Sequence, residues 1–217
     1  VRQEADLFGK VCFLRSISQK FHNGSESDLL FVGVENTFRF CLLGYSNGEV
    51  ITRCSGDFHE QISFLTEHEP LCIIDDKSRF VALHVYEHAM KILPVIISNH
   101  NEVILQSGFT MRIEESDIIH MGFVPYETRD GNFVASLGIL YLQDDKLNYK
   151  IYGVNFNDSK LVVTKLPTLS WEDTSAQFVI PFHNGILVPF DTHASLYSFP
   201  KLEQVATVSY QQAMITT

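Results

Sequence analysis

Short hydrophobic runs separated by turn signals recur along the whole sequence. The runs are rich in β-branched and aromatic residues and are mostly about four to nine residues long, which is typical of β-strands. No window shows a sustained apolar repeat of about 3.6 residues, so we expect little helix. We predict strands over residues 11–14, 29–34, 38–43, 71–74, 80–86, 90–97, 118–124, 133–142, 149–156, 161–163, 178–182, 185–190 and 195–199.

The spacing of these runs favours one all-β architecture over two others. Ser46-Asn47-Gly48, Asp144-Asp145-Lys146 and His183-Asn184-Gly185 are typical hairpin turns. About a dozen strands at spacings of roughly 8–12 residues indicate a sandwich, a barrel or a β-propeller. The strands fall into sets of about 40–50 residues, the length of one propeller blade, so a propeller is favoured. The sets lie near residues 9–45, 49–97, 103–156 and 160–199, and the first lacks a full complement of strands.

The amino-acid composition shows that the chain is acidic and has enough hydrophobic residues for a sizeable core. Of its 217 residues 45% are hydrophobic, and 16 Lys and Arg stand against 26 Asp and Glu. The formal net charge of −10 would repel a phosphate backbone, and the basic residues are scattered along the sequence. The sequence therefore argues against direct nucleic-acid binding by this segment. We also expect no membrane association, because no apolar run approaches the ~18 residues that cross a bilayer.

Residue patterns for catalysis or metal binding are missing from the sequence. Cys12, Cys41, Cys54 and Cys72 form no CxxC pair and lie mostly among apolar neighbours, so we expect buried, reduced thiols. No nucleophile elbow, P-loop or dinucleotide-binding glycine motif occurs. We therefore predict a protein that is not an enzyme and holds neither a metal nor a cofactor.

Two pairs of titratable residues could suggest chemistry by their spacing alone. His84 and His88 are four residues apart, but the first falls in a predicted strand and the second in the following turn, so they would not converge on a metal. Glu114 and Glu115 are adjacent, and adjacent residues in an extended chain point to opposite sides, so they make no catalytic dyad.

Several segments, in order and at similar spacing, resemble the amino-terminal propeller of the damaged-DNA-binding protein 1 family. The matching residues are 28–34, 40–45, 50–53, Gly56, 73–75, Arg79, Leu83, Tyr86, 91–94 and 111–115. The matches extend from about Leu7 to Phe199. The superfamily also includes the largest subunit of the cleavage and polyadenylation specificity factor and a large splicing-factor subunit.

The resemblance implies a partial β-propeller of about four to five blades out of roughly seven. Residues 1–217 are then expected to be part of a single amino-terminal β-propeller domain, and the chain a fragment of a longer multi-propeller protein. In the family, the first and third propellers grip WD40-type substrate receptors, and the second holds a cullin. The cullin would therefore bind through domains outside this chain.

The function implied by the resemblance is that of a non-catalytic scaffold. It would be the adaptor of a cullin-four RING-type ubiquitin ligase that presents substrate receptors in the DNA damage response, DNA repair and protein ubiquitination. The expected location is the nucleus and also the cytoplasm. The alternative is a scaffold subunit in mRNA 3′-end processing or splicing.

The resemblance also places the expected partner contacts. The segment 57–69 would face the receptor, and it contains no Lys or Arg although the family carries basic residues there. Its apolar residues are either buried beneath it or held out as anchors for a partner. The predicted partner-binding residues are Arg53, Phe58, Gln61, Phe64 and His84.

Overall fold

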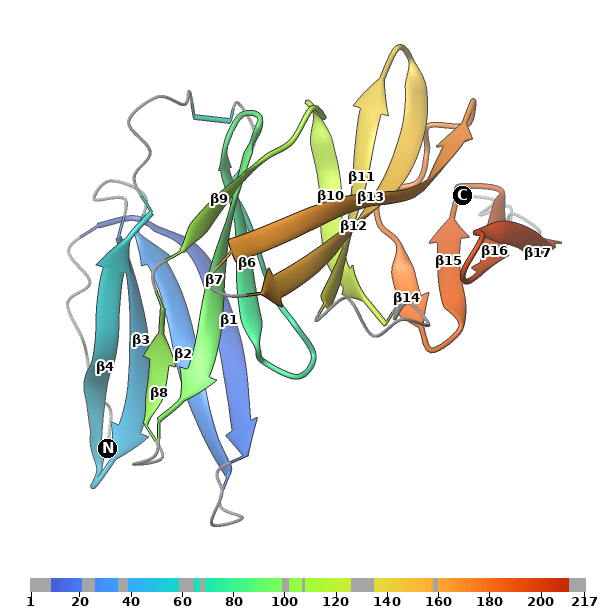
Figure 1. Ribbon diagram of the computed structural model, residues 1–217. Helices are drawn as coiled ribbons and strands as arrows, with labels where there is room; N and C mark the ends of the chain where they lie inside the picture. The colour runs from blue at the N-terminus through green and yellow to red at the C-terminus, as the bar shows by residue number, and fades with distance from the viewer. Residues whose placement is uncertain are drawn as a thin grey trace, which may run out of the picture. The chain divides into compact units, whose positions relative to one another are not determined.

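The computed structural model describes the chain as strands joined by turns and loops (Figure 1). The described residues are 9–20, 26–34, 39–58, 65–66, 69–98, 102–106, 108–125, 135–157 and 160–210. Over these ranges no helix is long and apolar enough to span a membrane. The chain divides into two compact units, Val1–Glu114 and Glu115–Thr217.

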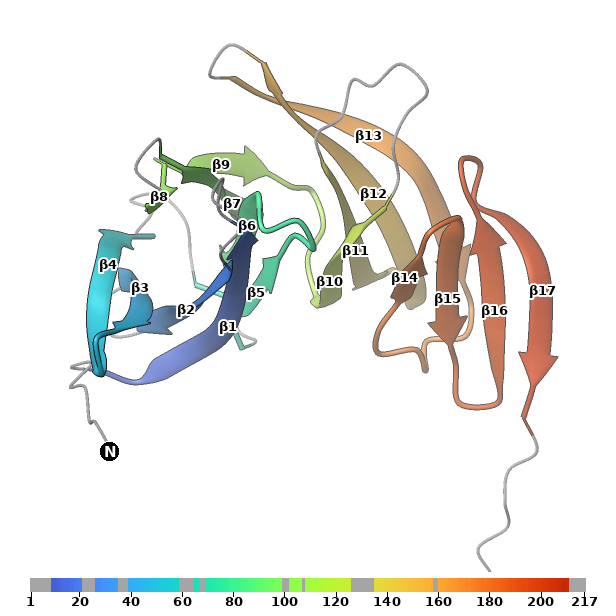
Figure 2. The same ribbon diagram turned by 90° about the horizontal axis from the view of Figure 1, so that it is seen from below.

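The first unit contains two antiparallel sheets. Sheet 1 has the strand order β1-β2-β3-β4, and these strands are Val11–Lys20, Glu26–Val34, Arg39–Ser46 and Glu49–Asp57. Sheet 2 has the order β5-β6-β7-β8, with β9 also paired to β7. Its strands are Leu71–Ile74, Phe80–Tyr86, Ala89–Ile97, Val103–Leu105 and Phe109–Arg112. Each strand pairs mainly with its sequence neighbour, so each sheet is a meander, as Figure 2 shows from a second direction.

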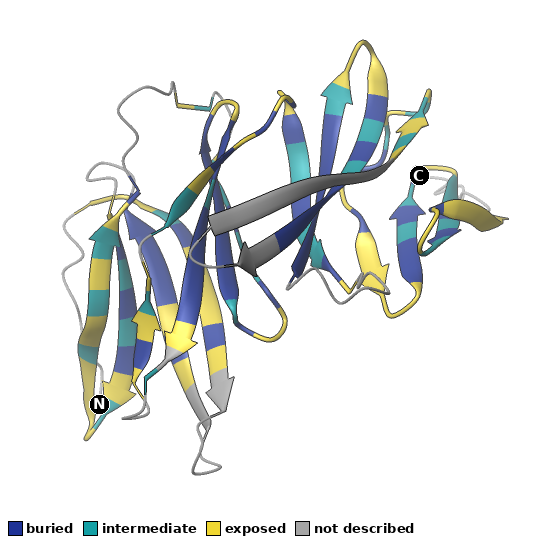
Figure 3. Cartoon of the chain, in the orientation of Figure 1, coloured by how far each residue is buried: buried dark blue, intermediate teal, exposed yellow. Residues whose placement is uncertain are grey.

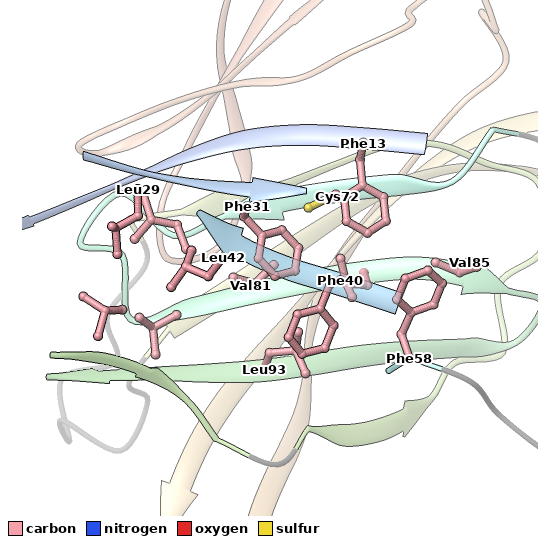
Figure 4. Packing of buried hydrophobic residues seen from close by; sticks show 14 of the residues in the cluster. Phe13, Leu29, Phe31, Phe40, Leu42, Phe58, Cys72, Val81, Val85 and Leu93 are labelled. Atoms are coloured by element: carbon pink, nitrogen blue, oxygen red, sulfur yellow. The ribbon is translucent and has the colours of Figure 1, made fainter. Parts of the chain in front are cut away.

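The core of the first unit lies between sheets 1 and 2 and is rich in phenylalanine (Figure 4). The Phe13 and Phe31 rings stack with centroids 5.6 Å apart, and the Phe31 and Phe40 rings lie 5.3 Å apart. Gly33 makes this packing possible, because a Cβ at that position would lie 2.0 Å from the Phe13 ring. The Arg15 side chain on β1 adds a hydrogen bond of 2.8 Å from Nε to the Cys72 carbonyl on β5.

The second unit also contains two antiparallel meanders. Sheet 3 has the order β10-β11-β12-β13, and its strands are Ile118–Val124, Ala135–Gln143, Lys146–Asn157 and Lys160–Trp171. Sheet 4 has the order β14-β15-β16-β17, and its strands are Ile180–Phe182, Gly185–Pro189, His193–Ser198 and Glu203–Ser209. Their shared core includes Leu140, Tyr149, Ile186, Val188 and Tyr197, so each sheet buries one apolar face against the other.

The hairpin turns follow the turn chemistry of the sequence. Asn47 and Gly48 have φ values of 53° and 87°, and Asp144 and Asp145 have φ values of 52° and 59°. Positive φ at both central residues defines a type I′ turn, whose twist matches that of the flanking strands. The predicted hairpins at these two positions are therefore confirmed.

The predicted strands at 71–74, 80–86 and 118–124 are confirmed residue for residue. The predicted grouping is wrong, because β4 completes sheet 1 and the first set therefore has all four strands. The strands β4, β8, β9 and β17 were not among the predicted runs. None of the β4 residues is fully buried and every β17 residue is exposed (Figure 3), so these two strands lack the hydrophobic pattern from which strands were predicted. The strands β8 and β9 are only three and four residues long.

Candidate partner-binding surface

Among the predicted partner-binding residues that the structure describes, Arg53 is the one exposed to solvent. It lies in β4, an edge strand of sheet 1. Leu42 pairs with Cys54 and Leu43 pairs with Thr52, so Arg53 is an extra residue at a β-bulge. A bulge redirects a side chain and is frequent at functional edges. The Arg53 side chain lies over Gly44. A Cβ at position 44 would lie 3.0 Å from Arg53 Nε, so glycine leaves room for the arginine side chain.

Phe58 and His84, two of the predicted partner-binding residues, lie in the interior. Phe58 is 1% exposed and His84 is 6% exposed. The Phe58 ring packs 5.8 Å from that of Phe13 in the core of the first unit (Figure 4). Because the Phe58 ring packs in the core between sheets 1 and 2, the structure supports the alternative that this residue is buried rather than an anchor for a partner. Direct partner contact by either residue stays a prediction, and burial does not favour it.

Gln61 and Phe64, the remaining predicted residues, lie outside the described part of the chain. Leu65 and Thr66, in the second half of the segment 57–69, are described. Leu65 forms an isolated antiparallel bridge with Tyr86, and the Thr66 amide donates a 3.0 Å hydrogen bond to the Val85 carbonyl. These bonds hold Leu65 and Thr66 against the end of β6. Leu65 is 49% exposed there, so the structure holds an apolar side chain at the surface in this region.

A second apolar surface, in sheet 4, was missed by sequence reasoning. Phe178 just before β14 and Ile180 and Phe182 within it are 46%, 45% and 38% exposed, whereas Val179 is 4% exposed. Pro181 is exposed as well, so β14 presents a continuous apolar stretch to solvent rather than one alternating side. The sequence showed an unbroken apolar run, which is equally compatible with burial on both sides. Exposed stretches of this kind are typical of surfaces that bind another protein segment.

The histidines and cysteines of the described residues form no metal site. His84 lies in β6 and His88 in the following turn, as predicted. Over the described ranges no group of three or more His, Cys, Asp or Glu side chains could hold a metal ion. All four cysteines are free thiols, of which Cys72 is buried and the other three are half-buried. Burial raises the pKa of Cys72 to about 12, so this thiol stays protonated.

Comparison with known proteins shows which family has this fold. A family model described as the RSE1/DDB1/CPSF1 first beta-propeller matches residues 2–214. The chain belongs to this family. The resemblance drawn from the sequence is confirmed, and so is the all-β propeller class, with four sheets observed as four blades.

Curated relatives carry the same family name. The chain is 29% identical over 163 residues to DNA damage-binding protein 1b of Arabidopsis thaliana. It is 28% identical over the same length to DNA damage-binding protein 1a of Arabidopsis thaliana and to DNA damage-binding protein 1 of Solanum lycopersicum. Each match covers 73% of this chain and 14% of the relative, so the chain spans about one seventh of the length of these proteins.

Proposed function

We propose that this chain is part of a non-catalytic scaffold, the adaptor of a cullin-four RING-type ubiquitin ligase that presents WD40-type substrate receptors. The observation that carries the proposal is the family match over residues 2–214, with relatives named DNA damage-binding protein 1. The cullin would bind through propellers outside this chain. The setting would be DNA repair and protein ubiquitination, in the nucleus and also in the cytoplasm.

The exposed side chains support a role in protein binding. Arg53 offers a cation on a bulged edge strand, and Leu65 offers an exposed apolar side chain in the segment 57–69. Arginine is enriched among the residues that dominate binding energy at interfaces. The acidic balance of the chain, with a net charge of −10, favours a protein partner over a phosphate backbone.

A scaffold in mRNA 3′-end processing or splicing is the second candidate. The observation that favours it is the description of the matching family model, which covers the first propeller of three kinds of protein rather than one. Both candidates are scaffolds with the same fold, so partner identity separates them.

Affinity purification of the full-length parent protein tests the proposal. We expect a cullin and WD40-type receptors to copurify. Copurification of polyadenylation or splicing subunits without a cullin would reject the ligase role and favour the second candidate.

The contribution of this chain is tested by reversing one exposed charge. Arg53→Glu in the full-length protein should lower receptor recovery by about tenfold or more, because a charge reversal at an interface cation costs more than 1.4 kcal/mol. Arg112→Glu, an exposed cation on β9, is the matched control and should leave recovery unchanged. Equal receptor recovery with both variants would remove Arg53 from the interface while leaving the scaffold role open.

A further inference from the structure

The segment immediately before β10 contains a buried carboxylate in the second unit. The side chain of Glu115 is 2% exposed, whereas the neighbouring Glu114 is exposed, as expected for adjacent residues that point to opposite sides. A carboxylate removed from water is costly unless it is paired and hydrogen-bonded. The partners of the Glu115 carboxylate therefore determine whether its burial is stabilising.

Two residues of β12 satisfy the Glu115 carboxylate. Lys150 Nζ forms an ion pair and a hydrogen bond with Glu115 Oε1. The Tyr152 hydroxyl donates a 2.6 Å hydrogen bond to Glu115 Oε2. Lys150 and Tyr152 are two residues apart on one strand and share a face, and Lys150 Nζ lies 5.3 Å from the Tyr152 ring centroid. Both carboxylate oxygens are thus held by the same strand.

The backbone just after Glu115 is attached to the neighbouring strand β11. The Leu142 amide donates a 3.2 Å hydrogen bond to the Asp117 carbonyl, and Ile118 begins β10 opposite Tyr141. Asp117 has a φ of 48°, in the left-handed region that Asp tolerates better than most non-glycine residues, and the chain turns there into β10. Residues 115–117 therefore run from a side-chain attachment on β12 to a backbone attachment on β11.

We propose that Glu115, Lys150 and Tyr152 form a clasp that fixes residues 115–117 to sheet 3 and thereby sets where β10 begins. The clasp holds by charge, because the Lys150 side chain is only 12% exposed and its ion pair with Glu115 is lost when Glu115 is neutralised. Opening the clasp frees this short segment and weakens the Leu142 to Asp117 hydrogen bond, while the rest of the second unit stays folded. This is a conformational device separate from the proposed scaffold role.

Amide hydrogen exchange, followed by NMR on the 217-residue chain, tests the clasp. Glu115→Gln removes the charge and keeps the side-chain size. We expect the Leu142 amide to exchange at least tenfold faster in this variant. The Phe190 amide, which donates to the His193 carbonyl between β15 and β16, reports on sheet 4 of the same unit and should keep its rate. Tyr152→Phe removes one hydrogen bond and keeps the ion pair, so it should accelerate Leu142 exchange by a smaller factor.

Glu172→Gln is the matched control. It breaks an ion pair with Lys146 in the same unit, where the two side chains are 81% and 48% exposed, and it should change neither amide. An unchanged Leu142 rate in folded Glu115→Gln protein would overturn the proposal. Equal acceleration of Leu142 and Phe190 in both Glu115→Gln and Tyr152→Phe would also overturn it, because the cluster would then stabilise the whole unit rather than one segment.

Discussion

Phe58→Ala separates a core role from a partner-binding role at a residue that the family resemblance assigned to an interface. The ring is 1% exposed and packs 5.8 Å from the ring of Phe13. If the ring acts in the core, the substitution removes core packing and leaves a cavity between sheets 1 and 2. If the interface assignment is right, it leaves folding nearly intact and weakens receptor binding.

The expected loss of unfolding free energy follows from the burial of the ring. A buried aromatic side chain covers about 150–250 Å², which at about 25 cal/mol per Å² gives roughly 4–6 kcal/mol before the retained methyl group is subtracted. Measured Phe→Ala substitutions in cores cost about 3–5 kcal/mol, in agreement with that figure. We therefore expect a loss of about 3–5 kcal/mol for Phe58→Ala. Phe58→Leu removes fewer buried carbons and should cost roughly 1–2 kcal/mol.

Urea unfolding, followed by circular dichroism, measures these losses. Phe178→Ala is the matched control, because this ring is 46% exposed and should lose less than half as much free energy. The leucine variant keeps the test informative if Phe58→Ala does not fold. A Phe58→Ala protein that unfolds at the wild-type urea concentration would refute the core assignment.

Three further predictions concern single side chains. Burial alone would raise the pKa of Glu115, but hydrogen bonds from Lys150 and Tyr152 and the Lys150 charge lower it below its ordinary value. The ionised Glu115 therefore stabilises the fold above the unfolded-state pKa of about 4.3, and this stabilisation is lost as the pH falls through the folded-state pKa. The urea midpoint should therefore fall more steeply with acid in the wild-type protein than in Glu115→Gln. With a pKa of about 12, the Cys72 thiol should react with iodoacetamide at pH 8 at least tenfold more slowly in the folded protein than in urea, and equal rates would contradict its burial. The Trp171 indole donates a 2.6 Å hydrogen bond to the Tyr197 hydroxyl, so Tyr197→Phe should cost roughly 1 kcal/mol and shift the emission of this sole tryptophan; unchanged emission would contradict the contact.

The chain's local pattern was sufficient for strands such as β6 that bury every side chain. Residues 80–86 are all buried and apolar except for His84, so the predicted and observed bounds agree. The hairpins at Asn47 and Asp144 were likewise predictable, because positive φ is tolerated by only a few residue types. Both features depend on interactions between residues close in the sequence or on direct burial.

The outer strands and the grouping of strands into sheets required the tertiary structure. The edge strands β4 and β17 bury no side chain fully, so hydrogen bonds to β3 and β16 determine them rather than a hydrophobic pattern. Sequence spacing could therefore not show that β4 completes sheet 1.

The same distinction applies to the candidate sites. Phe58 and Leu65 are both apolar residues in one charged segment, yet the first is buried under Phe13 and the second is exposed beside Tyr86. Glu115 is buried beside Lys150, a residue 35 positions away. The sequence by itself determined the all-β class and the family, because strand patterns and matched segments lie along the chain. Only the tertiary structure decided which side chains are exposed, because burial depends on residues that are distant in sequence.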